Sequence, residues 1–432
     1  MTRVLAALRL LLIVPLGAAG AQATLDTLRL PALRQAALAN DPRAAQLDLL
    51  AAQSALRLRN IGAEVRPALS FESQGQYQSD VASIPISLPG VSLPMPPHDA
   101  WDARLSAQQK LFDPTARPRR AVERAQVAES QARVRTVLYS VTESVNAAFF
   151  TALRSQAQMA ELETALTDLE AQLAVADARV EAGTALPGES NAIRAELLRR
   201  RQAVAEQGAI RRAAIAVLSD LVGRRIDQAQ PLSPPDLSGE VASASASADL
   251  RNRPEYEQFE RSRDVLRRMD EARAARDRPR ISAFGTLGYG RPGLKFLSDR
   301  FDSYWMTGVQ LEWTPWNWGT TGRDRQIAGL QRAMVVTEEQ AFTAALRRAV
   351  EQDLASIDRL ESAVVQDDQI IALRESILTE SRAQYAEAVI TSAEYVNRQT
   401  DVLAARLSRA IHRVELSQAR AHLLNTMGNE VR

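Results

Sequence analysis

The segment "SYWMTGVQLEWTPWNWG", residues 303–319, alternates polar and apolar residues within a chain otherwise rich in helix-forming residues. Four of the five Trp residues of the 432-residue sequence lie in it, and the fifth, Trp101, opens a similar stretch. Trp305 and Trp313 share one face with the aliphatic residues between them, whereas the amide and carboxylate side chains fall on the other face. This period of two predicts a strand with one apolar and one polar face.

Three further stretches have the same alternation, at residues 67–77, 101–108 and 278–290, and a Pro-rich connection at 83–99 separates the first two. Apolar outer faces, polar inner faces and aromatic residues at both ends are typical of strands in an outer-membrane barrel. The aromatic residues predicted to lie at the membrane interfaces are Tyr77, Trp101, Tyr289, Trp305, Trp313, Trp316 and Trp318. Four strands cannot close a barrel, and unpaired strand edges are not viable in lipid, so several chains would have to share one. A soluble sandwich with one solvated face would give the same alternation.

The remainder predicts long helices. Residues 119–182 contain neither Gly nor Pro, which allows about 95 Å of helix at 1.5 Å per residue. Late in this stretch, apolar residues from Leu162 to Val180 step by four and three, as in the seam of a coiled coil. A turn at 183–188 and a returning helix follow, and residues 330–427 again lack Gly and Pro.

The pattern of helix, hairpin, long helix, turn and helix occurs twice, with matching residues about 205 positions apart. A repeat of this length indicates two half-molecules rather than a solenoid. We therefore predict a signal peptide at 1–23, a first repeat at 24–225, a linker at 226–250 and a second repeat at 251–432.

The first residues predict export. Arg3 and Arg9 precede a short apolar run broken by Pro15, and Ala21–Ala23 matches an A-x-A cleavage site. The mature chain would then begin near Thr24. No later apolar run has the roughly 20 residues that a membrane-spanning helix needs, so any membrane crossing must use strands.

Composition excludes several classes of function. Lys and Arg number 53 against 52 Asp and Glu, and the net charge of +1 gives no support for a nucleic-acid or polybasic membrane-surface partner. The absence of Cys excludes disulfides, thiolate metal sites, Cys nucleophiles and a lipidated Cys. The three His lack ligand spacing, and we find no nucleophile–base set or phosphate loop. The sequence therefore predicts neither an enzyme nor a bound cofactor.

Four pieces resemble the TolC family of outer-membrane efflux proteins. They are "LRLPALRQAALANDPRAAQ" after the signal, the Arg-Pro junctions at 66–67 and 278–279, "QKLFDP" at 109–114, and "LRNRPEYEQ" at 250–258. The resemblance implies a mostly α protein with a small β part. Long coiled-coil helices would form a periplasmic tunnel, and three chains would each give four strands to one barrel in the outer membrane of a Gram-negative bacterium.

The resemblance also implies a gate at the tips of the two helical hairpins. The matching positions are Gly183, Glu189, Tyr385, Ala388, Glu394 and Asn397. Ala388 stands where the family pattern has Gly, and Asn397 where a second acid can occur, so an identical closed-state lock is not expected. Glu394 also matches a capping box with Thr391, and Glu189 suits a helix N-terminus.

The function implied is a passive exit duct of a tripartite efflux or type I secretion system, docked through a periplasmic adaptor onto an inner-membrane pump. The alternatives are a periplasmic adaptor, which lacks the duplicated strand pair, and a structural coiled-coil protein of an export complex, for which the polar strand faces have no use.

Overall fold

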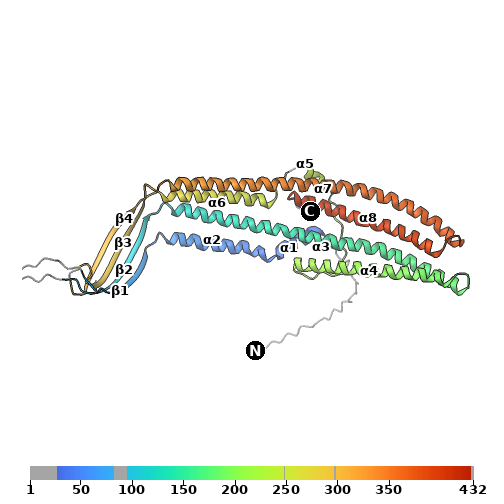
Figure 1. The fold of residues 1–432 in the computed structure, drawn as a ribbon, viewed down its shortest axis with the longest axis horizontal. Helices are drawn as coiled ribbons and strands as arrows, with labels where there is room; N and C mark the ends of the chain where they lie inside the picture. Colours follow the sequence, from blue (N-terminus) through green and yellow to red (C-terminus); the bar gives the residue numbers. More distant parts are fainter. Residues whose placement is uncertain (1–26, 82–94, 248, 296–297, 430–432) are drawn as a thin grey trace, which may run out of the picture.

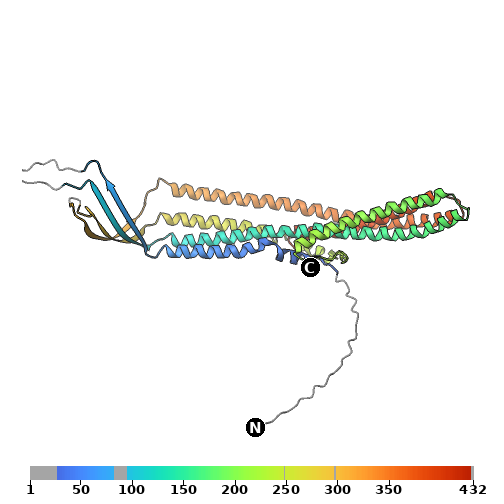
Figure 2. The ribbon, with the colours of Figure 1, turned by 90° about the horizontal axis from the view of Figure 1, so that it is seen from below.

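The computed structural model describes residues 27–81, 95–247, 249–295 and 298–429 as a long, narrow molecule with a sheet at one end and helical hairpin tips at the other (Figure 1). The view turned by 90° shows the same division (Figure 2). The predicted signal peptide at 1–23 and most of the Pro-rich connection lie outside the described residues. Across those four ranges, no helix combines the length and apolarity that a membrane crossing requires.

Two rods of about 100 Å, α3 and α7, run nearly the whole helical length. Each turns back at the tip into a shorter helix, α4 or α8, and α2 and α6 pack on the sheet-side halves of the rods. The helices are α1 (Leu30–Asn40), the 3₁₀ turn η1 (Pro42–Ala44), α2 (Ala45–Ala63), α3 (Ala116–Glu181), α4 (Pro187–Val222), α5 (Ser238–Ser247), α6 (Pro254–Arg276), α7 (Thr320–Ala386) and α8 (Ser392–Thr426).

Helix starts differ from those predicted. The helix α3 begins at residue 116 instead of 119, because Pro118 lies in the first turn, where no N–H partner is needed. The helix α7 begins at residue 320 instead of 330 and contains Gly322 and Gly329, each at a cost of about 1 kcal/mol in helix propensity. The predicted linker 226–250 contains α5, a short helix that its Pro/Ser-rich composition did not indicate.

The predicted coiled-coil seam joins the two helical hairpins. Leu169 and Ala176 of α3 cluster with Ile193 and Leu197 of α4, and also with Val396 of α8. Apolar residues seven apart return to the same helix face, so the seam stays directed at its neighbours along the rod. The cluster therefore packs the two hairpins of one chain against each other near their tips.

The main core lies at mid-length. Phe149 and Phe150 of α3 are 0% and 1% exposed and contact each other edge to face. Around them pack α1, the ends of α4 and α8, and the segment 226–237. Leu28 pairs with Leu232 in a parallel bridge, which brings the start of the described chain to this point.

The four strands form one antiparallel sheet in sequence order. They are β1 (Ala68–Tyr77), β2 (Asp99–Phe112), β3 (Arg280–Arg291) and β4 (Asp302–Glu312). The two hairpins predicted from positions about 200 residues apart therefore lie side by side through β2 and β3.

Each hairpin is tied to the helices at its base. In the first, Glu64 at the end of α2 accepts hydrogen bonds from Lys110 of β2 (3.1 Å) and Arg119 of α3 (3.1 and 2.6 Å). In the second, Asp277 after α6 accepts a hydrogen bond from the Trp313 indole (3.1 Å) through its carbonyl and one from Thr321 (2.9 Å) through its carboxylate. These contacts couple the orientation of the strands to that of the rods.

The Glu64 ion pairs should stabilise the protein in a pH-dependent way. The hydrogen bond from Arg119 holds the pKa of Glu64 below its ordinary value of 4.5. The folded-state pKa is lowered, so the stabilisation is complete above about pH 4.5 and is lost as the pH falls through the folded-state pKa. Because the pair is partly exposed, we expect Glu64→Gln to cost about 0.5–1 kcal/mol at pH 7.

This difference is measured by thermal unfolding followed by circular dichroism at pH 7 and in acid. Glu163→Gln, at an exposed position on α3, is the matched control and should leave the midpoint unchanged. A Glu64→Gln effect that persists undiminished in strong acid would contradict the assignment.

Candidate functional site

One face of the sheet is apolar. Phe71, Leu105, Leu287 and Trp305 lie opposite one another across all four strands, and they are between 46% and 72% exposed. A row of large apolar side chains left open across a whole sheet marks a surface that another apolar phase or molecule covers.

The opposite face is mainly polar. Arg104 donates to Glu72 on the neighbouring strand (2.9 and 2.5 Å), and Tyr304 donates to Asp102 (2.6 Å) across the sheet. Apolar exceptions are Phe284 and Met306, which are 37% and 42% exposed. The Arg104–Glu72 ion pair and the Tyr304–Asp102 hydrogen bond satisfy polar groups that remain partly exposed, which suits a wetted surface.

Three glycines of the sheet lie under aromatic rings of the strand opposite. A Cβ at Gly75 would lie 2.6 Å from the Trp101 ring, and one at Gly308 would lie 2.8 Å from the Phe284 ring. Gly288 lies in the same way under the ring of Tyr304. A ring packed over an opposing glycine fixes strand register and covers the exposed backbone.

The sheet has two open edges. The order β1-β2-β3-β4 leaves one side of β1 and one side of β4 without a partner strand among the described residues. Each edge presents a row of N–H and C=O groups that can pair with another chain.

The aromatic residues predicted for the interfaces are all exposed, between 54% and 78%. Tyr77, Trp101 and Tyr289 lie toward the end of the sheet remote from the helices, and Trp305 lies near the start of β4. Trp313, Trp316 and Trp318 follow β4 at the helical end. Their role at a membrane surface stays a prediction.

The two hairpin tips have the same backbone geometry. Gly183 and Ala388 both adopt left-handed conformations, with φ of 72° and 60°. The next residue at each tip donates its N–H back into the last helical turn, from Thr184 to Arg179 (2.9 Å) and from Val389 to Gln384 (2.8 Å). This is the Schellman arrangement, in which glycine is the favoured left-handed residue.

Both predicted gate acids lie in the first turn of a helix, and one of them caps it. Glu394 and Thr391 form a reciprocal capping box at the start of α8 (3.1 and 3.2 Å), as the sequence pattern indicated. Glu189 lies in the first turn of α4, where a carboxylate is favoured by the helix dipole. Asn397 is exposed on α8 and lies one turn beyond Glu394. A gate role for these residues stays a prediction.

Tyr385 belongs to a cluster that the sequence did not reveal. Its ring stacks on Tyr395 with centroids 5.1 Å apart and planes 3° from parallel, and the guanidinium of Arg179 lies 5.5 Å from its centroid. Arg382 and Gln172 each donate to the Tyr395 hydroxyl, at 3.3 and 3.5 Å. Since Arg179 and Gln172 come from α3, the cluster links the first hairpin to the second.

The charge state of this cluster is set by its surroundings. Burial, with a smaller contribution from Glu189, raises the pKa of Tyr385, so its phenol stays neutral. The hydrogen bond from Ser190 and the ion pair with Arg194 (2.9 Å) lower the pKa of Asp177, which ties α3 to α4 beside the tip. Arg382 has helical spacing to Tyr385 on α7, but Arg179 lies on α3, more than 200 positions away, so a sequence pattern could not have found it.

Ala388 carries a conformational cost that its counterpart Gly183 avoids. A left-handed residue with a Cβ costs about 1–2 kcal/mol, so Ala388→Gly should stabilise the second tip by about 1 kcal/mol. Amide hydrogen exchange around residues 383–389 measures the local opening free energy.

Gly183→Ala is the matched reverse change and should speed exchange at the first tip by a similar factor. Nothing lies within 4 Å of a Cβ built at Gly183, so crowding would not explain the result. Faster exchange in Ala388→Gly would show that the backbone at this turn is not strained.

No protein-family model and no curated protein sequence matches the chain. Solved structures do match. The chain covers 93% of its length against CusC, described in connection with transmembrane channel formation, at 17% identity, TM-score 0.69 and 92% of that chain. It is similar to the outer membrane protein VceC of Vibrio cholerae at 14% identity and TM-score 0.66, over 93% of this chain and 97% of that one.

It is also similar to the open state of the outer membrane channel MtrE of Neisseria gonorrhoeae, at 17% identity and TM-score 0.66, over 94% of this chain and 90% of that one. Identities this low establish the architecture, and coverage above 90% extends it to both sheet and helices. The chain therefore has the fold of the TolC-family outer-membrane channels.

Proposed function

We propose that three copies of this chain form a passive exit duct through the outer membrane and the periplasm, in a tripartite efflux or type I secretion system. The observation that carries the proposal is the four-stranded sheet, apolar on one face, polar on the other and open at both edges. The sheet is joined to helices about 100 Å long.

Strand length suits a membrane wall. The strands have 10, 14, 12 and 11 residues, and a transmembrane strand needs about 9–11 when tilted. The apolar face would contact lipid, and the polar face, with its Glu72–Arg104 pair, would line water.

The open edges allow copies of the chain to join into a closed ring. An even number of antiparallel strands makes β1 and β4 run in opposite directions, so β4 of one copy can pair in antiparallel fashion with β1 of the next. Three copies of four strands give twelve, an even number within the range of closed outer-membrane barrels. Closure would satisfy every edge N–H and C=O group that lipid cannot.

The helical ends would form the periplasmic gate and docking end. The Tyr385 cluster would hold the two hairpins of each chain together in the closed state. A periplasmic adaptor would bind at these tips and connect the duct to an inner-membrane pump, which supplies the energy. Glu189 and Glu394, each repeated three times around the axis, would form rings of carboxylates that favour cations.

The wall is tested by two adjacent residues of β3 on opposite faces. Leu287→Arg would place a cation toward lipid, at a cost of about 2–4 kcal/mol near the bilayer midplane. We expect it to abolish assembly of trimers in the outer membrane. Thr286→Arg would place the same charge toward the lumen, so we expect normal assembly with altered ion selectivity in planar bilayers.

Membrane fractionation, size in detergent and single-channel recording give the three readouts. If both variants assembled equally well, the proposal that the sheet forms a membrane-spanning wall would be wrong. A wild-type chain that is a monodisperse monomer without detergent would point instead to an adaptor or a structural coiled-coil protein.

The gate is tested by Tyr385→Ala. Losing the stacking and cation–π contacts removes about 1–2 kcal/mol from the closed state, which shifts the open-to-closed ratio by about tenfold. We expect higher mean conductance at unchanged trimer stability. Tyr385→Phe keeps the ring and should behave as wild type, so an open phenotype in Tyr385→Phe would refute the stacking argument.

A further inference from the structure

Arginines gather where the helices meet the sheet. They lie at the ends of α2 and α6 and at the starts of α3 and α7, which all border the sheet. The farthest, Arg124, is eight residues (124 − 116) past the start of α3, about 12 Å along the helix. We name this group the arginine belt; it comprises Arg59, Arg66, Arg117, Arg120, Arg124, Arg273, Arg276, Arg278 and Arg325.

These guanidinium groups have no acidic partner. Among the residues that the structure describes, none of the belt is ion-paired with a carboxylate. In the helical hairpins α3–α4 and α7–α8, by contrast, Arg194, Arg201 and Arg406 each lie within 3 Å of an Asp or Glu carboxylate. The sheet end of the helices therefore carries guanidinium groups that no carboxylate of the described residues pairs with.

Carboxylates also occur at the sheet end of the helices, but most of them already form ion pairs. Glu64 binds Lys110 and Arg119, and Glu271 pairs with Arg268 (3.1 Å). Three carboxylates there form no ion pair among the described residues: Asp324, exposed beside Arg325, and Asp270 and Asp277 at the end of α6. The unpaired arginines outnumber the unpaired acids, so the band attracts anions.

The belt directly adjoins the exposed tryptophans. Arg323, next to the belt on α7, donates to the carbonyl of Trp318 (3.1 Å). Trp318 contacts Trp316 edge to face, with ring centroids 6.0 Å apart, and both are more than 70% exposed. Tryptophan followed by arginine is the order expected on passing from the boundary of a bilayer into its headgroup layer.

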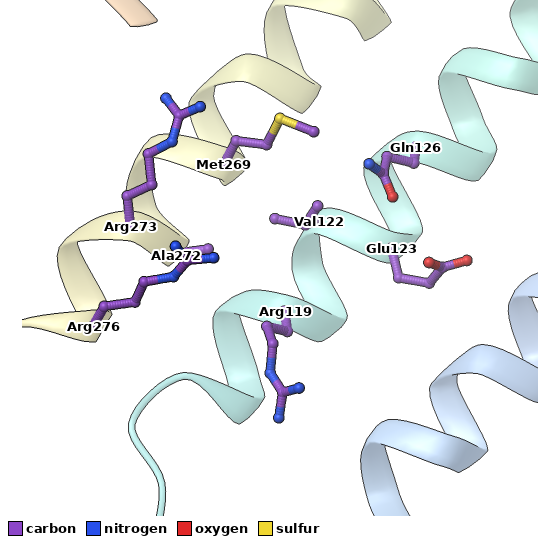
Figure 3. A pocket seen from close by; sticks show the side chains of 8 residues that line it. All are labelled: Arg119, Val122, Glu123, Gln126, Met269, Ala272, Arg273 and Arg276. Carbon is purple, nitrogen blue, oxygen red and sulfur yellow. The ribbon is translucent and has the colours of Figure 1, made fainter. Parts of the chain in front are cut away.

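A pocket of about 360 Å³ between α3 and α6 forms one candidate anion-binding site within the belt. Figure 3 shows Arg276 reaching from α6 toward α3, while Met269 and Val122 point toward each other between the helices. The other polar side chains of its lining are Arg119, Gln126, Arg273 and one carboxylate, Glu123, which is ion-paired with Arg57 (3.6 Å). A phosphate at Arg276 would leave room for a small polar headgroup beside it.

We propose that the arginine belt binds the phosphates of anionic phospholipids, in the leaflet that borders the helical part of the protein. The proposal rests on the proposed function, since it requires the sheet to span the membrane. Headgroups of this leaflet would lie beside the helix ends, and the belt would fix the depth of the channel in the bilayer.

The test compares two variants with the same change in charge. The belt variant carries Arg66→Gln, Arg117→Gln, Arg276→Gln and Arg278→Gln. The control carries Arg224→Gln, Arg225→Gln, Arg347→Gln and Arg359→Gln, all exposed positions away from the sheet. Native mass spectrometry of the full-length protein in detergent measures its affinity for phosphatidylglycerol and for phosphatidylcholine.

We expect the belt variant to lose phosphatidylglycerol affinity on the order of tenfold or more, because each basic residue near an anionic surface adds favourable energy. Phosphatidylcholine binding should be unaffected, and the control should keep wild-type affinity. Replacing the same four arginines by lysine should preserve binding, which separates loss of charge from loss of folding. Free glycerol phosphate should not displace the lipid.

Three outcomes overturn the proposal. One is unchanged phosphatidylglycerol affinity in a belt variant that still forms conducting trimers. That result would refute lipid binding by the belt and leave the proposed duct function standing. Another is altered ion selectivity in place of altered lipid affinity, which would place these arginines in the lumen. The third, displacement of the lipid by free glycerol phosphate, would indicate a soluble anion site. A wild-type chain that neither forms trimers nor conducts overturns the proposed function instead.

Discussion

The backbone N–H and C=O groups at the two open edges of the sheet need hydrogen-bond partners, and this need constrains the rest of the molecule. Water can satisfy the edge N–H and C=O groups of β1 and β4, but hydrocarbon cannot. The apolar row through Phe71, Leu105, Leu287 and Trp305 makes water an unfavourable neighbour for the same sheet. In the proposed assembly, pairing with further copies would satisfy the edge groups without water and leave the apolar face to lipid, because the even strand number lets β4 meet β1 in antiparallel fashion.

The helices extend this arrangement away from the sheet. Glu64 and Asp277 tie the strand ends to the rods, so a closed ring of strands would impose a ring of helices. At mid-length, the core around Phe149 and Phe150 joins the ends of α4 and α8 to α3. Beyond that core, the links between the hairpins include the seam at Leu169, a hydrogen bond from Arg200 to Thr400 (3.4 Å) and the Tyr385 cluster. Opening of the proposed gate at the tips would have to break the Tyr385 cluster.

The near-zero net charge of the chain is the sum of charges that are unevenly distributed along it. The formal net charge of +1 combines two regions. At the sheet end, the arginines of the belt form no ion pair with a described carboxylate, whereas ion pairs are frequent along the two helical hairpins. In the hairpins, pairing lets charged side chains lie between packed helices, as Glu196 and Arg200 do at 6% and 3% exposure. Near the sheet, the arginines of the belt have no such carboxylate partner among the described residues, so their charge is available to an external anion.

The sequence by itself determined the elements and their faces. Alternation at 303–319 and at the three related stretches gave the strands, the seam from Leu162 gave the coiled-coil face, and Thr391 with Glu394 gave the capping box, since each depends on residues close in sequence. Only the tertiary structure decided what distant segments bring together. The neighbours β2 and β3, the Arg179–Tyr385–Tyr395 cluster and the arginine belt all combine residues more than 100 positions apart. No periodicity records such meetings, because they are set by how complete helices and strands pack and not by the local pattern of either partner.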